Sequence, residues 1–161
     1  MVRHLERNPQ IGIVGPLTNN IGNEARIEVS YSDMAGMETV ARDLVTGYRG
    51  IWTEIPVAAY FCAMFRKSDL DRIGDLPIVY GRGMFEDDDH CASFRAAGLI
   101  SVLAEDAFVH HRLSASFDAL PSDERQDLFA RNRKIFEDRW GAWVPHRYRQ
   151  TRPAPSLPNA S

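Results

Sequence analysis

A short, entirely apolar run, IGIVGP at positions 11–16, restricts most strongly what this chain can fold into. The run stops at Gly15 and Pro16, two residues that interrupt regular structure. An apolar run of this length between turn residues is typical of a buried strand rather than of a helix. Because helical spacing recurs in the segments that follow, we expect an α/β protein.

Composition and charge indicate one soluble core. Of the 161 residues, 44% are hydrophobic and 25% are charged, which is enough to bury a single ordinary domain. The net charge is −3 and the basic residues are scattered except within 131–149, so nucleic acid is not an expected partner. No stretch approaches the roughly 18 apolar residues that span a bilayer, and the start lacks a secretory signal, so we expect a cytoplasmic location.

Local patterns predict the order of helices and strands. We expect the end of a helix at 1–8, closed by Asn8 and Pro9, and four further helices over 34–47, 68–74, 86–98 and 121–141. Asp33 and Ser68 are the predicted caps of the first two of these four, and glycines end the helices. We expect one or two central strands within 54–67, and two short strands over 99–105 and 106–111. Residues 17–33 should form an ordered, irregular loop, and the proline-rich end, 150–161, should be disordered.

The stretch GMFEDDDHCASFRAAG, at 83–98, sets four acidic residues at the start of a predicted helix. A first helical turn favours carboxylates by about 0.3–1 kcal/mol each, but neighbouring like charges repel, so capping explains one or two of them and not four. The helical period places Asp87 on the face that carries Cys91 and Phe94. This inward position predicts a functional carboxylate, whereas we expect Asp89 to be solvated.

Aromatic and histidine residues flank the acids. Phe85 precedes them in a glycine-containing turn, and an acidic group beside an aromatic ring at a helix entrance is a common way to hold a sugar. Further on, a strand-like run ends in His110 and His111, whose imidazoles can ligate a divalent metal. Because neighbouring strand residues point to opposite faces, the two histidines cannot both serve one site while the strand continues.

Four segments resemble a known family in their order: IGIVGPLTNNIGNEARI, AAYFCAMFRKSDLDRIGDL, GMFEDDDHCASFRAAGL and EDAFVHHRLSASF. Together they resemble the C-terminal half of family 2 glycosyltransferases of the GT-A fold, the nucleotide-sugar-dependent enzymes of bacterial polysaccharide assembly. The resemblance covers residues 8–149. It implies a partial GT-A domain over 1–149, with a Rossmann-like mixed sheet flanked by helices, that lacks the N-terminal nucleotide-binding half.

The resemblance implies roles for the acids. In such enzymes the Asp of a Glu-Asp motif takes the proton from the attacking acceptor hydroxyl, which makes Asp87 the general base. Glu86 and Asp88 would hold hydroxyls of a saccharide or lipid-linked acceptor, beside Phe85. The Glu-Asp-Asp run is also similar to the acceptor motif of β-1,4-galactosyltransferases. A direct displacement of this kind inverts the anomeric configuration of the transferred sugar.

The resemblance also implies a metal cofactor. These enzymes neutralise the leaving nucleoside diphosphate with Mg²⁺ or Mn²⁺, which is held by an Asp-x-Asp motif and often by a late histidine. That histidine corresponds to His110, with His111 as the alternative. Asp87 and Asp89 fit the Asp-x-Asp pattern, but they follow the IVGP strand, whereas the family's motif precedes it. We therefore expect the donor half to be missing from the chain, which alone should bind nucleotide-sugar weakly.

Two other functions remain open. A metal-dependent hydrolase would use a cluster of ligands formed by Asp87, Asp89, His90 and His110. A non-catalytic carbohydrate-binding module would hold sugar with the acids and with three tryptophans, namely Trp52, Trp140 and Trp143, although the last two more often close a core. Basic residues near the end of the chain also allow peripheral contact with anionic lipid at the inner face of the membrane.

Overall fold

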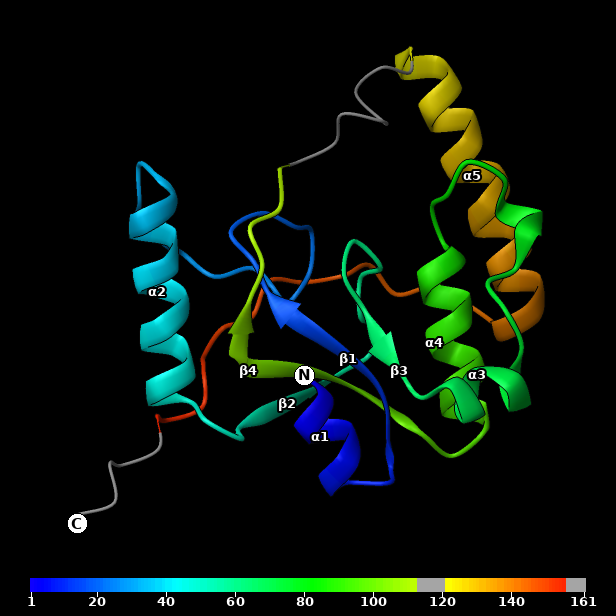
Figure 1. Cartoon of the computed structure of the whole chain (residues 1–161). Coiled ribbons are helices and arrows are strands. Elements are labelled where there is room, and N and C mark those ends of the chain that lie inside the picture. Colours follow the sequence, from blue (N-terminus) through cyan, green and yellow to red (C-terminus); the bar gives the residue numbers. More distant parts are fainter. Residues whose placement is uncertain (113–120, 156–161) are drawn as a thin grey trace.

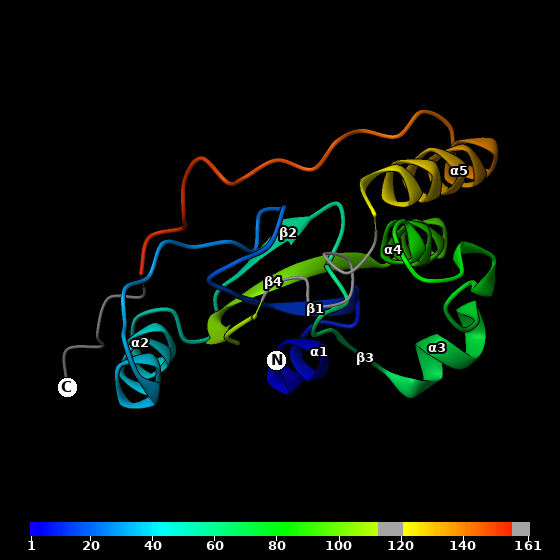
Figure 2. The same cartoon turned by 90° about the horizontal axis from the view of Figure 1, so that it is seen from above.

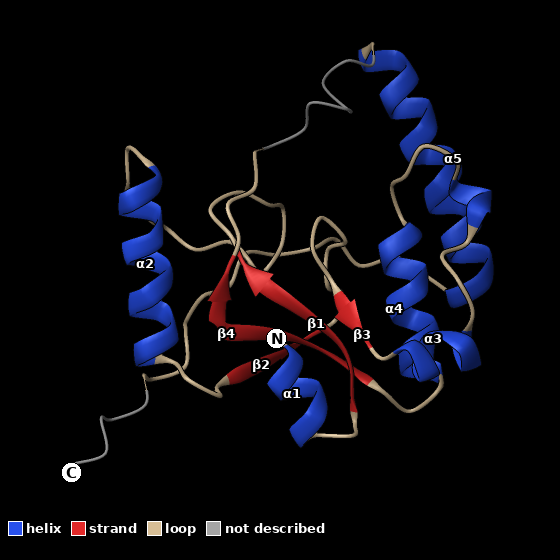
Figure 3. Cartoon of the chain, viewed as in Figure 1, coloured by secondary structure: helices blue, strands red, loops and turns tan. Residues whose placement is uncertain are grey.

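The computed structural model describes residues 1–112 and 121–155. In these residues a four-stranded mixed sheet of order β2-β4-β1-β3 forms the centre, and helices flank it (Figure 1). The predicted α/β class is confirmed, and the arrangement is compatible with a Rossmann-like fold. The elements in chain order are α1 (Val2–Arg7), β1 (Ile11–Leu17), α2 (Met34–Gly47), β2 (Trp52–Ile55), β3 (Met64–Phe65), α3 (Lys67–Ile73), η1 (Ile78–Tyr80), α4 (Glu86–Ala96), β4 (Ile100–Phe108) and α5 (Ser122–Trp140) (Figure 3).

β1 and β4 form the middle of the sheet. They pair in parallel, with Val14 opposite Val102, and every residue of β1 is buried. The buried strand predicted for 11–16 is therefore confirmed, and it extends to Leu17. β2 pairs antiparallel with β4, and β3 pairs antiparallel with β1, so the sheet is mixed.

The prediction of central strands within 54–67 is wrong. β2 ends before Pro56, which has no N–H group with which to continue a ladder. β3 is only two residues long. Among the described residues both strands lie at the edges of the sheet, and the apolar residues between them form a loop that buries Val57 against the core. The apolar run reflects a packed loop rather than a central strand.

The two short strands predicted for 99–105 and 106–111 are a single strand, β4. It runs through Glu105 and Asp106, where the acidic pair in the sequence indicates a break. Both acids are paired with protein groups: Asp106, for instance, accepts a backbone N–H at 2.8 Å and lies 2.7 Å from Nε2 of His4. Because their charges are satisfied inside the protein, the acids do not interrupt the strand.

Helices cover both faces of the sheet. Leu103 packs with Phe94 of α4, whereas its neighbour Val102 packs with Leu5 of α1. Since successive strand residues point to opposite faces, α4 and α1 lie on opposite sides of the sheet (Figure 2). The approach of α4 to β1 is so close that a Cβ atom at Gly12 would lie 2.6 Å from the Phe94 ring.

Most helix predictions are close to the structure. Asp33 caps α2 by accepting the N–H of Gly36 at 2.8 Å, and α4 begins at Glu86 as predicted. α5 ends before Gly141. Ser68 is not a cap, because α3 already begins at Lys67. None of the helices in residues 1–112 and 121–155 combines the length and the apolar character needed to cross a bilayer.

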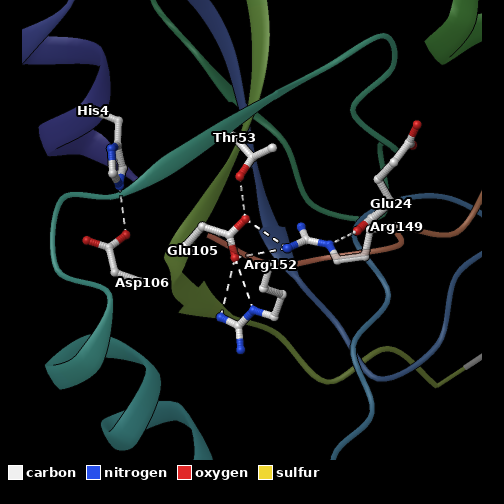
Figure 4. Close-up of polar contacts among 7 residues, drawn as sticks. All are labelled: His4, Glu24, Thr53, Glu105, Asp106, Arg149 and Arg152. Carbon is white, nitrogen blue, oxygen red and sulfur yellow. Dashed lines mark hydrogen bonds and ion pairs between the residues drawn. The ribbon is translucent and has the colours of Figure 1, made fainter. Parts of the chain in front are cut away.

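The C-terminal segment, residues 142–155, runs from α5 across the sheet to α2 (Figure 2). Glu105, which has no exposed surface, holds it (Figure 4). The Glu105 carboxylate accepts hydrogen bonds from Arg149 at 2.9 and 3.1 Å, from Arg152 at 3.3 Å and from the Thr53 hydroxyl at 2.7 Å. Through Arg152, the described part of the predicted disordered tail thus packs on the domain, whereas 156–161 lie outside the described residues.

Replacing Glu105 by Gln should destabilise the fold. Arg149, whose side chain is only 11% exposed, would keep a buried charge without its partner, and such a loss typically costs about 3–5 kcal/mol. Urea unfolding followed by circular dichroism measures the change in the free energy of unfolding. The control, Asp138→Asn, breaks an exposed pair with Lys134 and should cost about 0.5 kcal/mol or less. Equal losses in the two variants would contradict the role given to Glu105.

Candidate active site

The turn before α4 has a strained backbone. Met84 and Phe85 have φ angles of 68° and 76°, in the left-handed region that residues other than glycine rarely adopt. Each such residue costs about 1–2 kcal/mol, and the strain persists where surrounding structure enforces it, often at functional sites. The buried Asn132 of α5 enforces it here, because its amide donates to the carbonyl oxygens of Tyr80, Gly83 and Met84 at 2.9, 2.8 and 3.1 Å.

Asp89 links α4 to α5, and the prediction that it is solvated is wrong. Its side chain is 1% exposed and accepts the Tyr80 hydroxyl at 2.7 Å and the Arg139 guanidinium at 2.8 Å. His90 is also buried, and its Nδ1 lies 2.9 Å from the Tyr60 hydroxyl. The distant partners from α5 and from the loops explain why these polar groups can be buried.

Asp88 holds the C-terminal segment. One carboxylate oxygen accepts the indole N–H of Trp143 at 3.0 Å, and the other lies 3.3 Å from Nε2 of His146. The hydrogen bond with Asp88 is the largest effect on His146 and raises its pKa, while burial acts in the opposite direction. Both carboxylate oxygens of Asp88 thus already have hydrogen-bond partners within the protein.

Asp87 has the environment of a proton acceptor. It retains some exposed surface, and its Oδ1 accepts the backbone N–H of Asp88 at 3.0 Å. Burial raises its pKa to about 7, the charges of Asp88 and Glu86 add to this rise, and the Asp88 N–H and His146 oppose it. A carboxyl group that titrates near neutral pH is well matched to taking a proton from a bound hydroxyl.

Glu86 and Phe85 flank this carboxyl. Burial raises the pKa of Glu86, and its Oε2 is buried without a hydrogen-bond partner in the described part of the chain. An unsatisfied buried carboxylate oxygen is costly, which adds to the unfavourable energy of this turn. The Phe85 ring is 3% exposed, and its centroid lies 5.1 Å from that of Phe129 and 5.2 Å from that of Trp143. Phe85 therefore anchors an aromatic cluster.

A cleft of about 310 Å³, here called the acidic cleft, is lined by Phe85, Asp87 and Asp88 but not by Glu86. It lies at the start of α4, beside which α5 packs (Figure 1). Carboxylates, aromatic rings and one imidazole line it together. The lining residues are Ile21, Gly22, Asn23, Val57, Ala59, Met84, Phe85, Asp87, Asp88, Phe129, Trp143 and His146. A polar group next to aromatic faces suits a sugar, whose ring has hydroxyl edges and apolar faces.

The two histidines at the end of β4 differ in their surroundings. The Nδ1 of His111 lies 2.7 Å from the Asn20 carbonyl oxygen, and its ring stacks on Phe61 at 4.6 Å. His110 is exposed, and its Nδ1 contacts the Tyr31 hydroxyl at 2.5 Å. This contact leaves Nε2 of His110 as the nitrogen that could serve as a single metal ligand. The assignment of a metal to His110 stays a prediction.

A full metal site is not assembled within residues 1–112 and 121–155, where no group of three His, Cys, Asp or Glu side chains is placed to hold an ion. The ligand set considered for a hydrolase is divided in the structure. Asp89 is occupied by Tyr80 and Arg139, and His90 is occupied by Tyr60. Both side chains thus already have protein partners, and the metal-dependent hydrolase stays an alternative that the structure does not test.

The three tryptophans do not form one platform. Trp52 lies on the edge strand β2 with its side chain 37% exposed, and Trp140 lies under the Arg139 guanidinium at 4.8 Å. Of the three, only Trp143 lines the acidic cleft. It is fixed there by Asp88, so the cleft offers a single, oriented indole.

Sequence reasoning did not assign two important residues, Asn132 and His146. For Asn132 a signal exists, because it lies between Leu128 and Phe136 at helical spacing and so puts an amide on an apolar stripe. For His146 the sequence carries none, since its role depends on where the C-terminal segment lies.

Comparison of the chain with family models, curated proteins and solved structures gives no match. The class of this protein is therefore described by its fold and by the geometry of its site. The described residues form an α/β protein with a mixed sheet, and a carboxyl of raised pKa lies in an aromatic-lined cleft at the start of a helix.

Asp87→Asn should stabilise the fold above neutral pH. A carboxyl whose pKa rises from 3.8 to about 7 on folding binds its proton more tightly in the folded state, so its effect on stability becomes increasingly unfavourable between these pH values. Removing the charge should raise the free energy of unfolding by about 2–4 kcal/mol at pH 8 and much less at pH 4.5. Urea unfolding at both pH values measures this difference. No gain at pH 8 would contradict the raised pKa.

Proposed function

We propose that this chain is the acceptor-side part of an inverting glycosyltransferase of the family 2, GT-A type, with Asp87 as the general base. The observation that carries the proposal is the position of Asp87, a partly exposed carboxyl of pKa about 7 in a cleft with an indole wall. Helix capping does not account for the raised pKa, because a helix N-terminus favours the ionised carboxylate and so lowers the pKa of a carboxyl group.

The proposed reaction is a direct displacement. An acceptor hydroxyl attacks the anomeric carbon of the donor sugar, its proton passes to Asp87, and the bond from that carbon to the nucleoside diphosphate breaks with the electron pair on the leaving group. A sugar hydroxyl is a weak nucleophile, and a positioned base contributes about 10²–10⁴-fold to the rate of such a step. The attack comes from the face opposite the leaving group, which inverts the configuration.

The other residues of the cleft orient the acceptor. Trp143 lines the cleft and offers an aromatic face for stacking on the sugar ring. Phe85 positions this indole by packing against Trp143. Glu86 is not among the residues that line the cleft, so its role in holding an acceptor hydroxyl stays a prediction. Asp88, whose oxygens already accept bonds from protein groups, contributes mainly by holding this wall in place.

In this proposal the donor side belongs to the nucleotide-binding half of such enzymes, a part that the resemblance matches to none of the residues 8–149. In these enzymes Mg²⁺ or Mn²⁺ neutralises the leaving diphosphate, and His110 is the residue of this chain that would contribute a ligand to it. The outer edge of β3 carries no partner strand among the described residues, so a strand of that half has a place to pair. The acceptor remains a saccharide or a lipid-linked saccharide.

Sugar transfer tests the proposal. The chain, alone and extended by the protein sequence encoded upstream of Met1, is incubated with radiolabelled nucleotide sugars, Mn²⁺ and saccharide acceptors. We expect transfer by the extended protein, and we expect Asp87→Asn to lower kcat by about 10²–10⁴-fold with little change in the KM of the donor. The matched control is Asp123→Asn, which removes an exposed carboxylate in the first turn of α5 and should leave kcat unchanged.

Two outcomes would overturn the proposal. Full activity of Asp87→Asn would show that another group is the base. Saccharide binding that survives the substitution, without transfer by the extended protein to any acceptor, would instead favour a non-catalytic carbohydrate-binding module, in which Trp143 holds the sugar.

A further inference from the structure

The C-terminal segment brings an imidazole into the acidic cleft. Nε2 of His146 lies 3.2 and 3.3 Å from the two carboxylate oxygens of Asp88, and the side chain is 23% exposed. Contacts on both sides fix the segment in place, because Trp143 donates to Asp88 and Arg149 pairs with Glu105. The reaction proposed above uses no group of His146.

We propose that His146 is a positioning residue for the base. It holds Asp88 by a hydrogen bond and places a positive charge beside the Asp87–Asp88 pair, so that Asp87 is ionised when an acceptor hydroxyl binds. The role in transfer rests on the proposed function of Asp87, whereas the electrostatic coupling between His146 and the two carboxylates does not.

The repulsion between neighbouring carboxylates creates the need for a cation. Asp87 and Asp88 are adjacent in the first turn of α4, and burial removes most of the water that would screen them. Without a cation nearby, the two carboxylates do not both stay ionised, because one of them binds a proton. If that one is Asp87, it cannot act as a base. An imidazolium in contact with Asp88 counters this repulsion, and the charge of His146 indeed lowers the pKa of Asp87.

The charged groups around the cleft favour the protonated form of His146. Two charged residues of α5 contact Trp143. The guanidinium of Arg133 lies over the Trp143 ring at 5.8 Å, and Glu137 accepts the Trp143 backbone N–H at 3.1 Å. Negative groups outnumber positive ones around His146. The titratable groups that face this region from the surrounding elements are Glu24, Tyr60, Glu86, Asp87, Asp88, Cys91, Arg133 and Glu137.

A purely structural role predicts something different. If His146 only pins the C-terminal segment through its hydrogen bond to Asp88, a neutral donor of similar reach should replace it fully. His146→Gln keeps a donor and removes the charge, so it separates the two roles. Arg147→Gln is the matched control, because it removes a positive charge from the adjacent exposed residue.

The first test needs no substrate. Carbon-13 NMR of the side-chain carboxyls follows the titration of Asp87 in the parent chain and in both variants. We expect His146→Gln to raise the pKa of Asp87 by about one unit and Arg147→Gln to leave it unchanged. We also expect Asp88→Asn to lower the pKa of His146 toward its ordinary value. An unchanged Asp87 titration in a folded His146→Gln chain overturns the proposal.

The second test uses the extended protein in the transfer assay. The acidic limb of the pH profile of kcat should move upward by about one unit in His146→Gln, with the KM of the acceptor within about twofold of the parent. An unchanged profile with full rescue by Gln would overturn the role in transfer. If the NMR coupling is found but no protein form transfers sugar, the transferase assignment fails, and with it the role of His146 in transfer.

Discussion

The arrangement of the candidate site depends on one buried charge, that of Glu105. A carboxylate without exposed surface in the middle of a central strand is tolerated only with cations and donors around it. Arg149 and Arg152 provide them, and both belong to the C-terminal segment, which therefore has to cross the sheet (Figure 4). The residues that precede them, Trp143 and His146, are thereby laid against the start of α4. The ion pairs that hold the C-terminal segment against the sheet therefore also hold one wall of the acidic cleft in place.

The site itself combines several unfavourable features. Two residues with left-handed backbone precede α4, like charges follow one another in its first turn, and Asp87 is surrounded by protein that resists its ionisation. Asn132 and Arg139 of α5 offset part of this cost by binding the strained turn and Asp89. A chain selected for stability alone has no reason to keep such an arrangement, which is why these features support a functional role for the turn and the acids.

The sequence predicts those parts of the structure that depend on neighbouring residues. The apolar run of β1, the Asp33 cap and the start of α4 at Glu86 all follow from local patterns. The rest depends on pairs that are far apart in the chain: Asp89 meets a partner 50 residues away, and Glu105 meets partners 44 and 47 residues away. Local periodicity carries no information on such pairs, so it wrongly predicts Asp89 in solvent and a break of β4 at its acidic pair.

The central claim is that the acidic cleft binds a saccharide beside Asp87. Two-dimensional NMR of the nitrogen-15-labelled chain, titrated with a panel of mono- and oligosaccharides, measures this most directly. We predict saturable shifts that centre on the indole N–H of Trp143 and on the backbone amides of 84–88, and that disappear in Trp143→Ala. If every saccharide that binds instead shifts residues elsewhere, with the signals of the cleft unmoved, saccharide binding beside Asp87 is contradicted.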